Sequence, residues 1–433
     1  MRISVIQKMI RADMLLKGYC YMKRKPAFIL AGVLGLSAAA LCLSGCGKNE
    51  ATKAAAESEE TEKEGNGEAV EASEEEDEKA SEEAPKEEEQ HVPKVAIILP
   101  GGPEDKRWRT DAEIMQAELE KAGHLSEVFY AEGDADTQVK QILEAAVPEL
   151  TSAIIIAPQD PYSLSEALQA AADEKIPVFD YEELIMNTPN ISYFLTFDAR
   201  AAGQLMADRI IADNNLSIPE SGETPESRTI EYLMGEGSGT NDLFLLNGLL
   251  ERLQEYYDAG VLTSLSYGST YNRASVVEDQ RLLQEKGFVK VLRDLYGQDG
   301  PDIICTRGKT LTKAGASLQS RETGTVMPGT EENESGGYQI AADIDAFVIQ
   351  QIASGQVHAA VFKDNRKLAQ KCAETVINCL KDEDPEVSNY EEYDNGVKII
   401  KAVTCDAEII DKDNYQVLID DGFFEEEDIR PQG

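Results

Sequence analysis

The hydrophobic positions of the chain begin to follow a regular pattern at Val95. A short apolar run, Val95–Leu99, lies between clusters of proline and glycine, which is typical of a parallel strand that is buried on both faces. Apolar residues then recur at helical spacing until Gly123 ends the pattern, at Ala112, Met115, Leu119 and Ala122. The pattern therefore predicts a strand, a loop and a helix.

The same alternation of short apolar runs and helical patterns continues along the chain. Further strands are expected at 126–130, 152–156, 177–179, 192–196, 229–234, 262–267, 302–305, 324–327 and 357–362. Helices are expected at 136–150, 162–174, 199–214, 241–257, 309–319 and 338–353, with a broken helix over 273–297. Units of this kind predict an α/β protein in which two doubly wound parallel sheets form two lobes.

Polar and aromatic side chains follow several of the predicted strands. In open α/β sheets, ligands bind at the carboxyl ends of the strands, so we select the residues at these positions as candidate ligand contacts. They are Arg107, Trp108, Asp160, Glu182, Tyr271, Arg307 and Lys363. Carboxylates, amides and basic groups hydrogen-bond the polar groups of a ligand, and an aromatic ring can cover an apolar face.

Each of these candidates also has an ordinary structural role that the sequence leaves open. Arg107 could neutralise a neighbouring carboxylate, and Trp108 could pack against the core beside the first helix. Asp160 could cap the helix that follows it. Arg307 and Lys363 could form surface ion pairs in this acidic chain.

The charge of the chain is strongly negative and unevenly distributed. The formal net charge of −40 makes nucleic acid an unfavourable partner. The segment 47–89 contains eighteen acidic residues, five lysines and no aromatic residue, which is the composition of a disordered segment. We expect residues 47–91 to be a solvated tether.

An export signal precedes this tether. Met22–Lys25 is basic, residues 27–43 are apolar, and Leu43–Cys46 reads Leu-Ser-Gly-Cys, an order that predicts a secretory signal over residues 1–46. Its end resembles the bacterial lipobox, which implies diacylation of Cys46 and an extracytoplasmic lipid-anchored protein. A retained transmembrane anchor is the alternative, and Met22 is an alternative start.

Cysteine and histidine are too sparse for a metal site. The seven cysteines include no Cys-x-x-Cys pair, and the three histidines are scattered. We expect Cys305, Cys372, Cys379 and Cys405 to be buried free thiols.

The chain also shows no motif of a phosphate-binding loop or of an enzyme. The glycines of 235–239 lack the Lys-Ser/Thr ending of a phosphate-binding loop, and no set of catalytic residues is visible. The sequence therefore predicts neither metal, cofactor nor enzyme activity.

From about Lys94 to Ile429 the chain resembles the type I periplasmic binding proteins, and within them the xylose-type sugar-binding lipoproteins of ABC transporters. The resemblance rests on the order of short motifs, namely Arg107-Trp108, Thr137-Gln138, 184–187, Phe197-Asp198, Phe362-Lys363, 412–414 and 419–423. It implies three crossings between the lobes, which form a three-strand hinge. The lobes would comprise residues 92–196 with 364–401, and 197–363 with 402–428, before a tail at 429–433.

The resemblance also implies a function and further site residues. Asn241 and Lys363 keep the family's residue types, Tyr271 falls where the family has a stacking tryptophan, and the family's Gln-Asp pair falls on Thr330-Glu331. The family's Asp-Arg pair falls on Glu182-Glu183, and its Asn-Asp pair on Arg307-Gly308, so the ligand itself stays open. Asn241 could equally act as a helix cap.

We therefore expect an extracytoplasmic solute-binding lipoprotein that captures a small polar ligand for an ABC importer. The resemblance implies a monosaccharide such as xylose, a permease as partner and closure of the lobes on ligand. An alternative is a receptor of the same fold that presents its ligand to a membrane histidine kinase or chemoreceptor.

Overall fold

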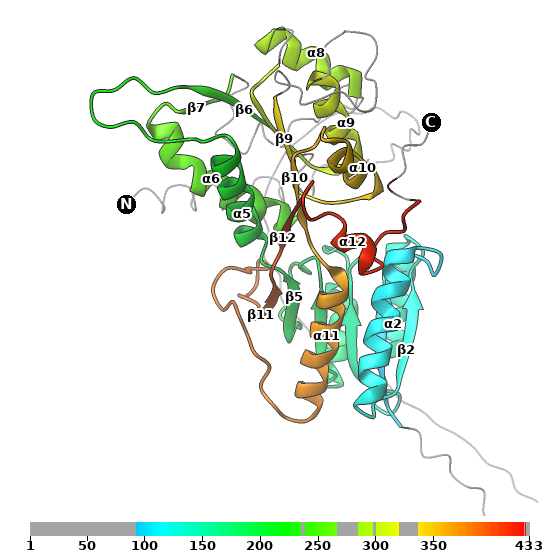
Figure 1. The fold of residues 1–433 in the computed structure, drawn as a ribbon. Helices are drawn as coiled ribbons and strands as arrows, with labels where there is room; N and C mark the ends of the chain where they lie inside the picture. Colours follow the sequence, from blue (N-terminus) through cyan, green and yellow to red (C-terminus); the bar gives the residue numbers. More distant parts are fainter. Residues whose placement is uncertain are drawn as a thin grey trace, which may run out of the picture. The chain divides into compact units, whose positions relative to one another are not determined.

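The computed structural model describes residues 92–234, 239–265, 285–297, 300–319, 337–427 and 429. The predicted signal, Cys46 and the tether lie outside these residues, as do Tyr271, Glu331 and the strand expected at 324–327. Figure 1 shows the described elements in chain order by colour.

The first sheet has six strands in the order β11-β5-β4-β3-β1-β2. They are β1 (Lys94–Leu99), β2 (Ser126–Tyr130), β3 (Thr151–Ile156), β4 (Val178–Tyr181), β5 (Tyr193–Phe197) and β11 (Ala402–Cys405). Every neighbouring pair is parallel. The chain therefore reverses its winding direction between β1 and β3, the kind of position where α/β sheets bind ligands.

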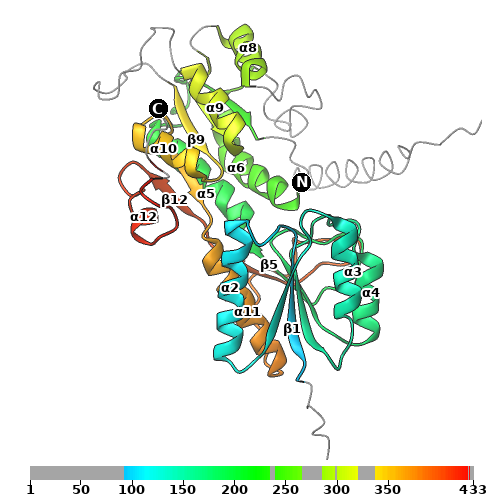
Figure 2. The ribbon, with the colours of Figure 1, turned by 90° about the vertical axis from the view of Figure 1, so that its right-hand side faces the viewer.

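Helices cover both faces of this sheet because its strands are apolar on both sides. Val95, Ile97 and Leu99 pack on one face, whereas Ala96 and Ile98 pack on the other. The first face is covered by α2 (Lys106–Lys121) and α11 (Asn365–Leu380), and the second by α3 (Ala135–Ala145) and α4 (Ser165–Asp173). Figure 2 shows the two helix layers on either side of β1.

The second sheet repeats this arrangement with the order β12-β10-β9-β8-β6-β7. Its strands are β6 (Arg228–Leu233), β7 (Leu262–Thr263), β8 (Ile303–Thr306), β9 (Tyr338–Ala341), β10 (Ala359–Phe362) and β12 (Glu408–Asp411). Only β12 runs antiparallel to its neighbour within this described sheet. The two α/β lobes that the sequence predicts are thus confirmed.

The helices of the second lobe also form two layers. On one face lie α5 (Ala199–Asp213) and α6 (Thr240–Asp258). On the other lie α8 (Glu285–Tyr296), α9 (Gly308–Gln319) and α10 (Ala346–Ser354), with the short α12 (Val417–Asp420) packed beside α10. Helices α5 and α6 pack closely against each other, as the glycines below explain.

Several predicted boundaries are wrong. The helix expected at 338–353 is a strand, β9, followed by α10, because Tyr338 and Ile340 face one core while Ala341 faces the other. The helix expected at 136–150 ends at Ala145, before Pro148. The helix expected at 162–174 begins at Ser165, and β7 comprises two residues of the strand expected at 262–267.

The third crossing between the lobes also lies later than expected. Residues 402–405 were assigned to the second lobe, but β11 pairs with β5 in the first sheet over this range. Strand β12 is the first element afterwards to pair in the second sheet. The strand pairing therefore puts this crossing between Cys405 and Glu408.

Two glycines let α5 and α6 cross with their backbones in contact. A Cβ atom on Gly203 would lie 1.9 Å from the Leu245 carbonyl oxygen, and one on Gly248 would lie 2.0 Å from the Arg200 carbonyl oxygen. Both obstacles are backbone atoms, which cannot rotate away. The close crossing thus requires glycine at both positions.

We expect Gly203→Ala and Gly248→Ala each to destabilise the protein by about 1–3 kcal/mol, because the added methyl group must force the helices apart. The measurement is thermal unfolding, in which such a loss lowers the melting temperature by several degrees. Ala201→Ser, at an exposed position of α5, is the control and should have little effect. Unchanged melting of both glycine variants would contradict the close crossing.

Candidate functional site

The loop after β1 leads into α2, which places two charged side chains on one helical face. Asp105 caps the helix, because its Oδ1 accepts the Arg107 backbone N–H at 2.9 Å. Arg107 and Asp111 are one turn apart, with Nε of Arg107 3.7 Å from Oδ2 of Asp111. The Arg107 guanidinium also forms an ion pair with Glu182, which follows β4.

Asp111 is a buried carboxyl group at the base of this site. It is 1% exposed and accepts a hydrogen bond from the Tyr181 hydroxyl at 3.1 Å. Burial raises the pKa of Asp111 to about 7, although the positive charge of Arg107 acts in the opposite direction. Asp111 therefore titrates near neutral pH.

The Trp108 side chain packs against the loop that follows β1. Its ring is so close to Gly101 that a Cβ on this glycine would lie 2.3 Å from Cδ1 of the indole. The ring packs on the core of the first lobe, and the Arg107 guanidinium carbon lies 4.2 Å from the ring centroid. Core packing thus accounts for much of its position, while Arg107 covers part of the ring.

The turn after β4 connects the two lobes through hydrogen bonds. Glu182 has a φ of 73°, a conformation that is unusual for a residue other than glycine. Its carbonyl oxygen accepts the side-chain amide of Asn241 at 2.6 Å and the Thr196 hydroxyl at 3.1 Å. Asn241 belongs to α6 of the second lobe, so its amide contacts the first lobe directly.

The carboxyl ends of the second sheet supply the remaining charges. Arg307 follows β8 and forms an ion pair with Asp242, and its Nε lies 4.0 Å from Oδ2 of Asp343. The Asp343 carboxylate also accepts the backbone N–H of Gly308 at 3.1 Å. Two carboxylates thus position the Arg307 guanidinium.

Lys363 follows β10 and stands apart from these ion pairs. Its ammonium group forms no hydrogen bond or ion pair with the residues that the structure describes. Burial, followed by the charge of Arg307, lowers the pKa of Lys363, while Asp343, Glu182 and Asp242 raise it. These influences place Lys363 close to charges of both lobes.

The structure thus brings some of the candidate residues together and leaves others apart. Arg107, Glu182, Asn241, Arg307 and Lys363 lie at facing carboxyl ends of the two sheets. The Asp160 carboxylate instead accepts the Tyr162 backbone N–H at 2.9 Å, which is a local turn. Tyr271 and Glu331 cannot be placed, because they lie outside the described residues.

Four further acidic residues belong to this site and were not among the candidates. Asp111 lies inside the first helix, and Glu183 and Asp242 are neighbours of residues that we did select. Asp343 was assigned to a helix, whereas it lies two residues after the end of β9. A correct reading of the alternation in 338–341 would have indicated its place at a strand end.

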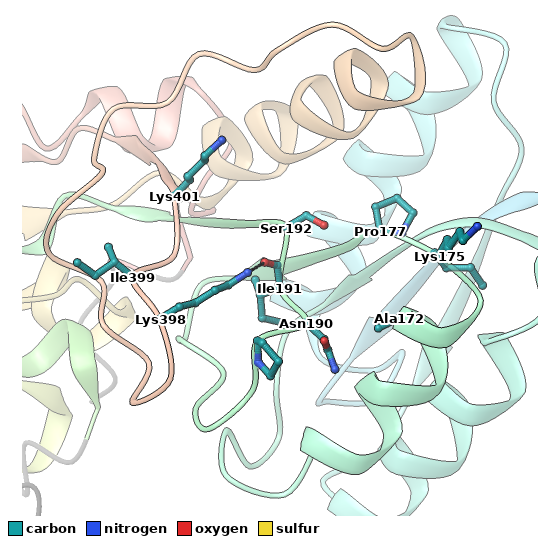
Figure 3. Close-up of a pocket in the computed structure, with 11 residues that line it drawn as sticks. Ala172, Lys175, Pro177, Asn190, Ile191, Ser192, Lys398, Ile399 and Lys401 are labelled. Atoms are coloured by element: carbon teal, nitrogen blue, oxygen red, sulfur yellow. Dashed lines mark hydrogen bonds between the residues drawn. The ribbon is translucent and has the colours of Figure 1, made fainter.

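A hollow of about 630 Å³ lies elsewhere on the first lobe. Its lining includes Lys175, Ile191, Lys398 and Lys401, which precede β4, β5 and β11. Figure 3 shows Lys398 extending to Ile191, whose carbonyl oxygen it contacts at 2.9 Å. The hollow is thus at the amino ends of the strands, whereas the candidate site lies at the opposite edge, where the charged residues meet.

The described residues contain no group of three metal-binding side chains. The four cysteines among them are free thiols, but only Cys305 and Cys372 are buried, whereas Cys379 and Cys405 are half-buried. The expectation that all four are buried is therefore wrong for two of them. Among the helices of the described residues, none combines the length and the apolar composition that a membrane crossing requires.

Comparison with known proteins agrees with this architecture. Residues 95–384 match the model of the periplasmic binding protein domain. The chain belongs to the periplasmic binding protein family. This membership confirms the resemblance stated above and the two-lobed α/β fold.

Two similar proteins match this chain over most of their own length. The multiple sugar-binding periplasmic receptor of Rhizobium radiobacter is 27% identical over 330 residues, which cover 75% of this chain and 89% of the receptor. The D-xylose-binding periplasmic protein of Haemophilus influenzae is 26% identical over 330 residues, covering 75% and 88%. These relatives are named for the binding of sugars and not for an enzymatic reaction.

A solved structure with the same fold is the ABC transporter solute-binding protein of Clostridium phytofermentans with bound β-D-glucose. It is 24% identical and has a TM-score of 0.61, and the match covers 78% of this chain and 100% of that one. A carbohydrate-transporter solute-binding protein of Chloroflexus aurantiacus in complex with D-glucose is 20% identical, with a TM-score of 0.57 and coverage of 78% and 98%. At these identities the likeness concerns the fold.

We expect Asp111→Asn to change how stability depends on pH. The pKa of Asp111 is about 7 in the folded protein, above its ordinary value of 3.8. Between pH 3.8 and pH 7 the folded state therefore holds a proton on Asp111 that the unfolded state has lost. Its contribution to stability is complete below pH 4 and is lost as the pH rises to about 7, at no more than about 1.4 kcal/mol per pH unit.

The measurement is the melting temperature of both proteins between pH 4 and 8.5. The difference in melting temperature, variant minus wild type, should increase as the pH rises towards 7 and should stay constant above that pH. A difference that does not vary with pH would contradict the assignment of the raised pKa to Asp111. Asp136→Asn, in the exposed first turn of α3, is the control.

Proposed function

We propose that this periplasmic binding protein binds a small neutral sugar between its lobes, a monosaccharide such as D-xylose, and delivers it to an ABC importer. The observation that carries this proposal is the meeting of charged and amide side chains from both sheets at one boundary. Sugar hydroxyls both donate and accept hydrogen bonds, so a sugar site needs donors and acceptors together. Arg107, Asn241 and Lys363 are donors, and Glu182 is an acceptor.

The balance of charge at this boundary favours a neutral ligand. Three cations, Arg107, Arg307 and Lys363, lie among the carboxylates of Glu182, Asp242 and Asp343. The two further acidic groups, Asp111 and Glu183, have a pKa that burial raises to about 7, so each carries only part of a negative charge near neutral pH. A ligand with a full charge would leave one buried charge without compensation, which is costly. Relatives that are named for binding several sugars or D-xylose support the same ligand class.

We also propose that Cys46 carries a lipid anchor and that residues 47–91 connect it to the first lobe. The Leu-Ser-Gly-Cys motif after an apolar segment supports this arrangement. Two acyl chains suffice for stable membrane attachment. The partner in transport would be a permease that recognises the lobes after they close on the sugar.

Lys363 provides the most direct test of the binding site. In a thermal-shift screen of pentoses and hexoses, a true ligand at about 100 times its Kd should stabilise the protein by about 2.7 kcal/mol. With that ligand, Lys363→Ala should raise the Kd about fivefold or more, because a half-buried donor is lost. Lys412→Ala, an exposed lysine of the second lobe, should bind as the wild type does.

Two results would overturn the proposal. One is the absence of any shift with the sugars while an amino acid or nucleoside stabilises the protein. The other is an unchanged Kd for Lys363→Ala, which would remove the site from this boundary even if a sugar binds.

The anchor has its own test. We expect Cys46→Ser to move the protein from the membrane fraction to the soluble extracytoplasmic fraction, because the thiol at the acylation position of the Leu-Ser-Gly-Cys motif is lost. Immunoblotting of the fractions is the measurement, and Cys42→Ser is the control within the same apolar segment. Membrane retention of the Cys46 variant would argue for a transmembrane anchor instead.

A further inference from the structure

The amino terminus of α6 lacks a cap from its own lobe. Its N-cap residue is Gly239, which makes no side-chain hydrogen bond to the helix. The first N–H groups of a helix have no partner within the helix, and the helix dipole adds positive charge there. An acceptor from outside the helix is therefore strongly favoured at this position.

A residue of the first lobe supplies this acceptor. Oε1 of Glu183 accepts the backbone N–H of Thr240 at 3.0 Å. Gly239 leaves the necessary space, since a Cβ on this residue would lie 3.0 Å from Oε2 of Glu183. The carboxylate thus takes the place of a side-chain cap, but it comes from the turn after β4 in the other lobe.

The next residue strengthens the same connection. Asn241 donates its side-chain amide to the Glu182 carbonyl oxygen at 2.6 Å. Two successive residues of α6 therefore bind two successive residues of the β4 turn. Because Arg107 forms an ion pair with Glu182, this connection lies directly beside the proposed sugar site.

We propose that Glu183 is a positioning residue that latches the two lobes together by capping α6 across their boundary. In this role it does not need to contact the sugar. It stabilises the arrangement of the lobes that contains this contact, which we call the closed form, and so determines how easily the lobes separate before and after ligand binding. The inference deepens the proposed function, because closure is the step that a binding protein couples to its ligand.

The surroundings of Glu183 make the latch sensitive to pH. Burial, together with the negative charges of Asp242 and Glu182, raises the pKa of Glu183 to about 7, although the Thr240 N–H and Arg307 act in the opposite direction. The titratable and charged groups that face it are Glu182, Asp242, Arg307, Tyr162 and Asp180.

The direction of the pH effect follows from this shift. When the lobes separate, the carboxyl group enters water and its pKa returns towards its ordinary value of 4.5. The closed form thus binds a proton more tightly, and closure is favoured at low pH. This advantage is lost as the pH rises from about 4.5 to about 7.

Two variants remove the latch from opposite sides. Glu183→Ala removes the acceptor, and Thr240→Pro removes the donor N–H. Proline is favoured at the first position of a helix, and Gly239 already has an extended ψ of 152°, which suits a residue before proline. The helix should therefore form in the second variant, and a wild-type circular dichroism spectrum would verify this.

The readout is the radius of gyration without ligand, measured by small-angle scattering. We expect both variants to be measurably more expanded than the wild type, and the double variant to be no more expanded than either single one, because both remove one hydrogen bond. With ligand, each variant should bind several-fold more weakly. Glu166→Ala in the first turn of α4 and Ala346→Pro at the first position of α10 are the controls.

The pH dependence adds a signature that a merely structural role would not produce. The wild type should expand as the pH rises from 5 to 7.5, whereas Glu183→Gln should show little change. If Glu183→Ala and Thr240→Pro stay as compact as the wild type, the latch is wrong. If they expand but no sugar binds, the latch stands and the proposed function fails, so the two failures are distinguishable.

Discussion

The central strands of both sheets must be covered on both faces, and the rest of the structure depends on this requirement. Strands such as β1 are buried on each side, so each lobe needs two layers of helices. Each helix returns the chain along one face of the sheet to the amino end of the next parallel strand. The connections that leave the carboxyl ends of the strands therefore gather at one edge. In the first sheet this edge carries Arg107 and Glu182, and in the second it carries Arg307 and Lys363.

The polar groups at these edges show how charge is distributed in the proposed ligand site. Arg107 and Arg307 are each positioned by carboxylates, which stabilises them without a ligand. Lys363 has no such partner among the described residues, and its lowered pKa reflects the unfavourable environment of a half-buried cation. The lysine is the group in this site that would gain most from a new acceptor, such as a sugar hydroxyl.

The turn after β4 takes part in both the proposed latch and the proposed sugar site. Glu182 contributes its side chain to the charged site and its carbonyl oxygen to Asn241, whereas Glu183 contacts the start of α6. Any change in the separation of the lobes thus alters both the latch and the position of the charged groups. The close crossing of α5 and α6 at two glycines holds α6 firmly within the second lobe. A displacement of the first turn of α6 should therefore move the second lobe with it.

The sequence by itself determined the class of fold and the positions of most strands. Buried parallel strands are short apolar runs, and the residues after them mark the edge where ligands bind. For this reason Arg107, Glu182, Arg307 and Lys363 could be selected before the structure was known. The same reasoning failed at 338–353, because a short alternating run before a helix has the apolar spacing of one continuous helix, and Asp343 was missed with it.

The tertiary structure alone decided which of these groups meet. Glu183 and Thr240 are 57 residues apart in the chain, and no local pattern indicates that a carboxylate of one lobe caps a helix of the other. The pKa of Asp111 depends on burial beneath Arg107 and Tyr181, which follows from packing and not from its neighbours in sequence. Local periodicity encodes the elements, whereas partners and burial depend on how distant elements pack together in space.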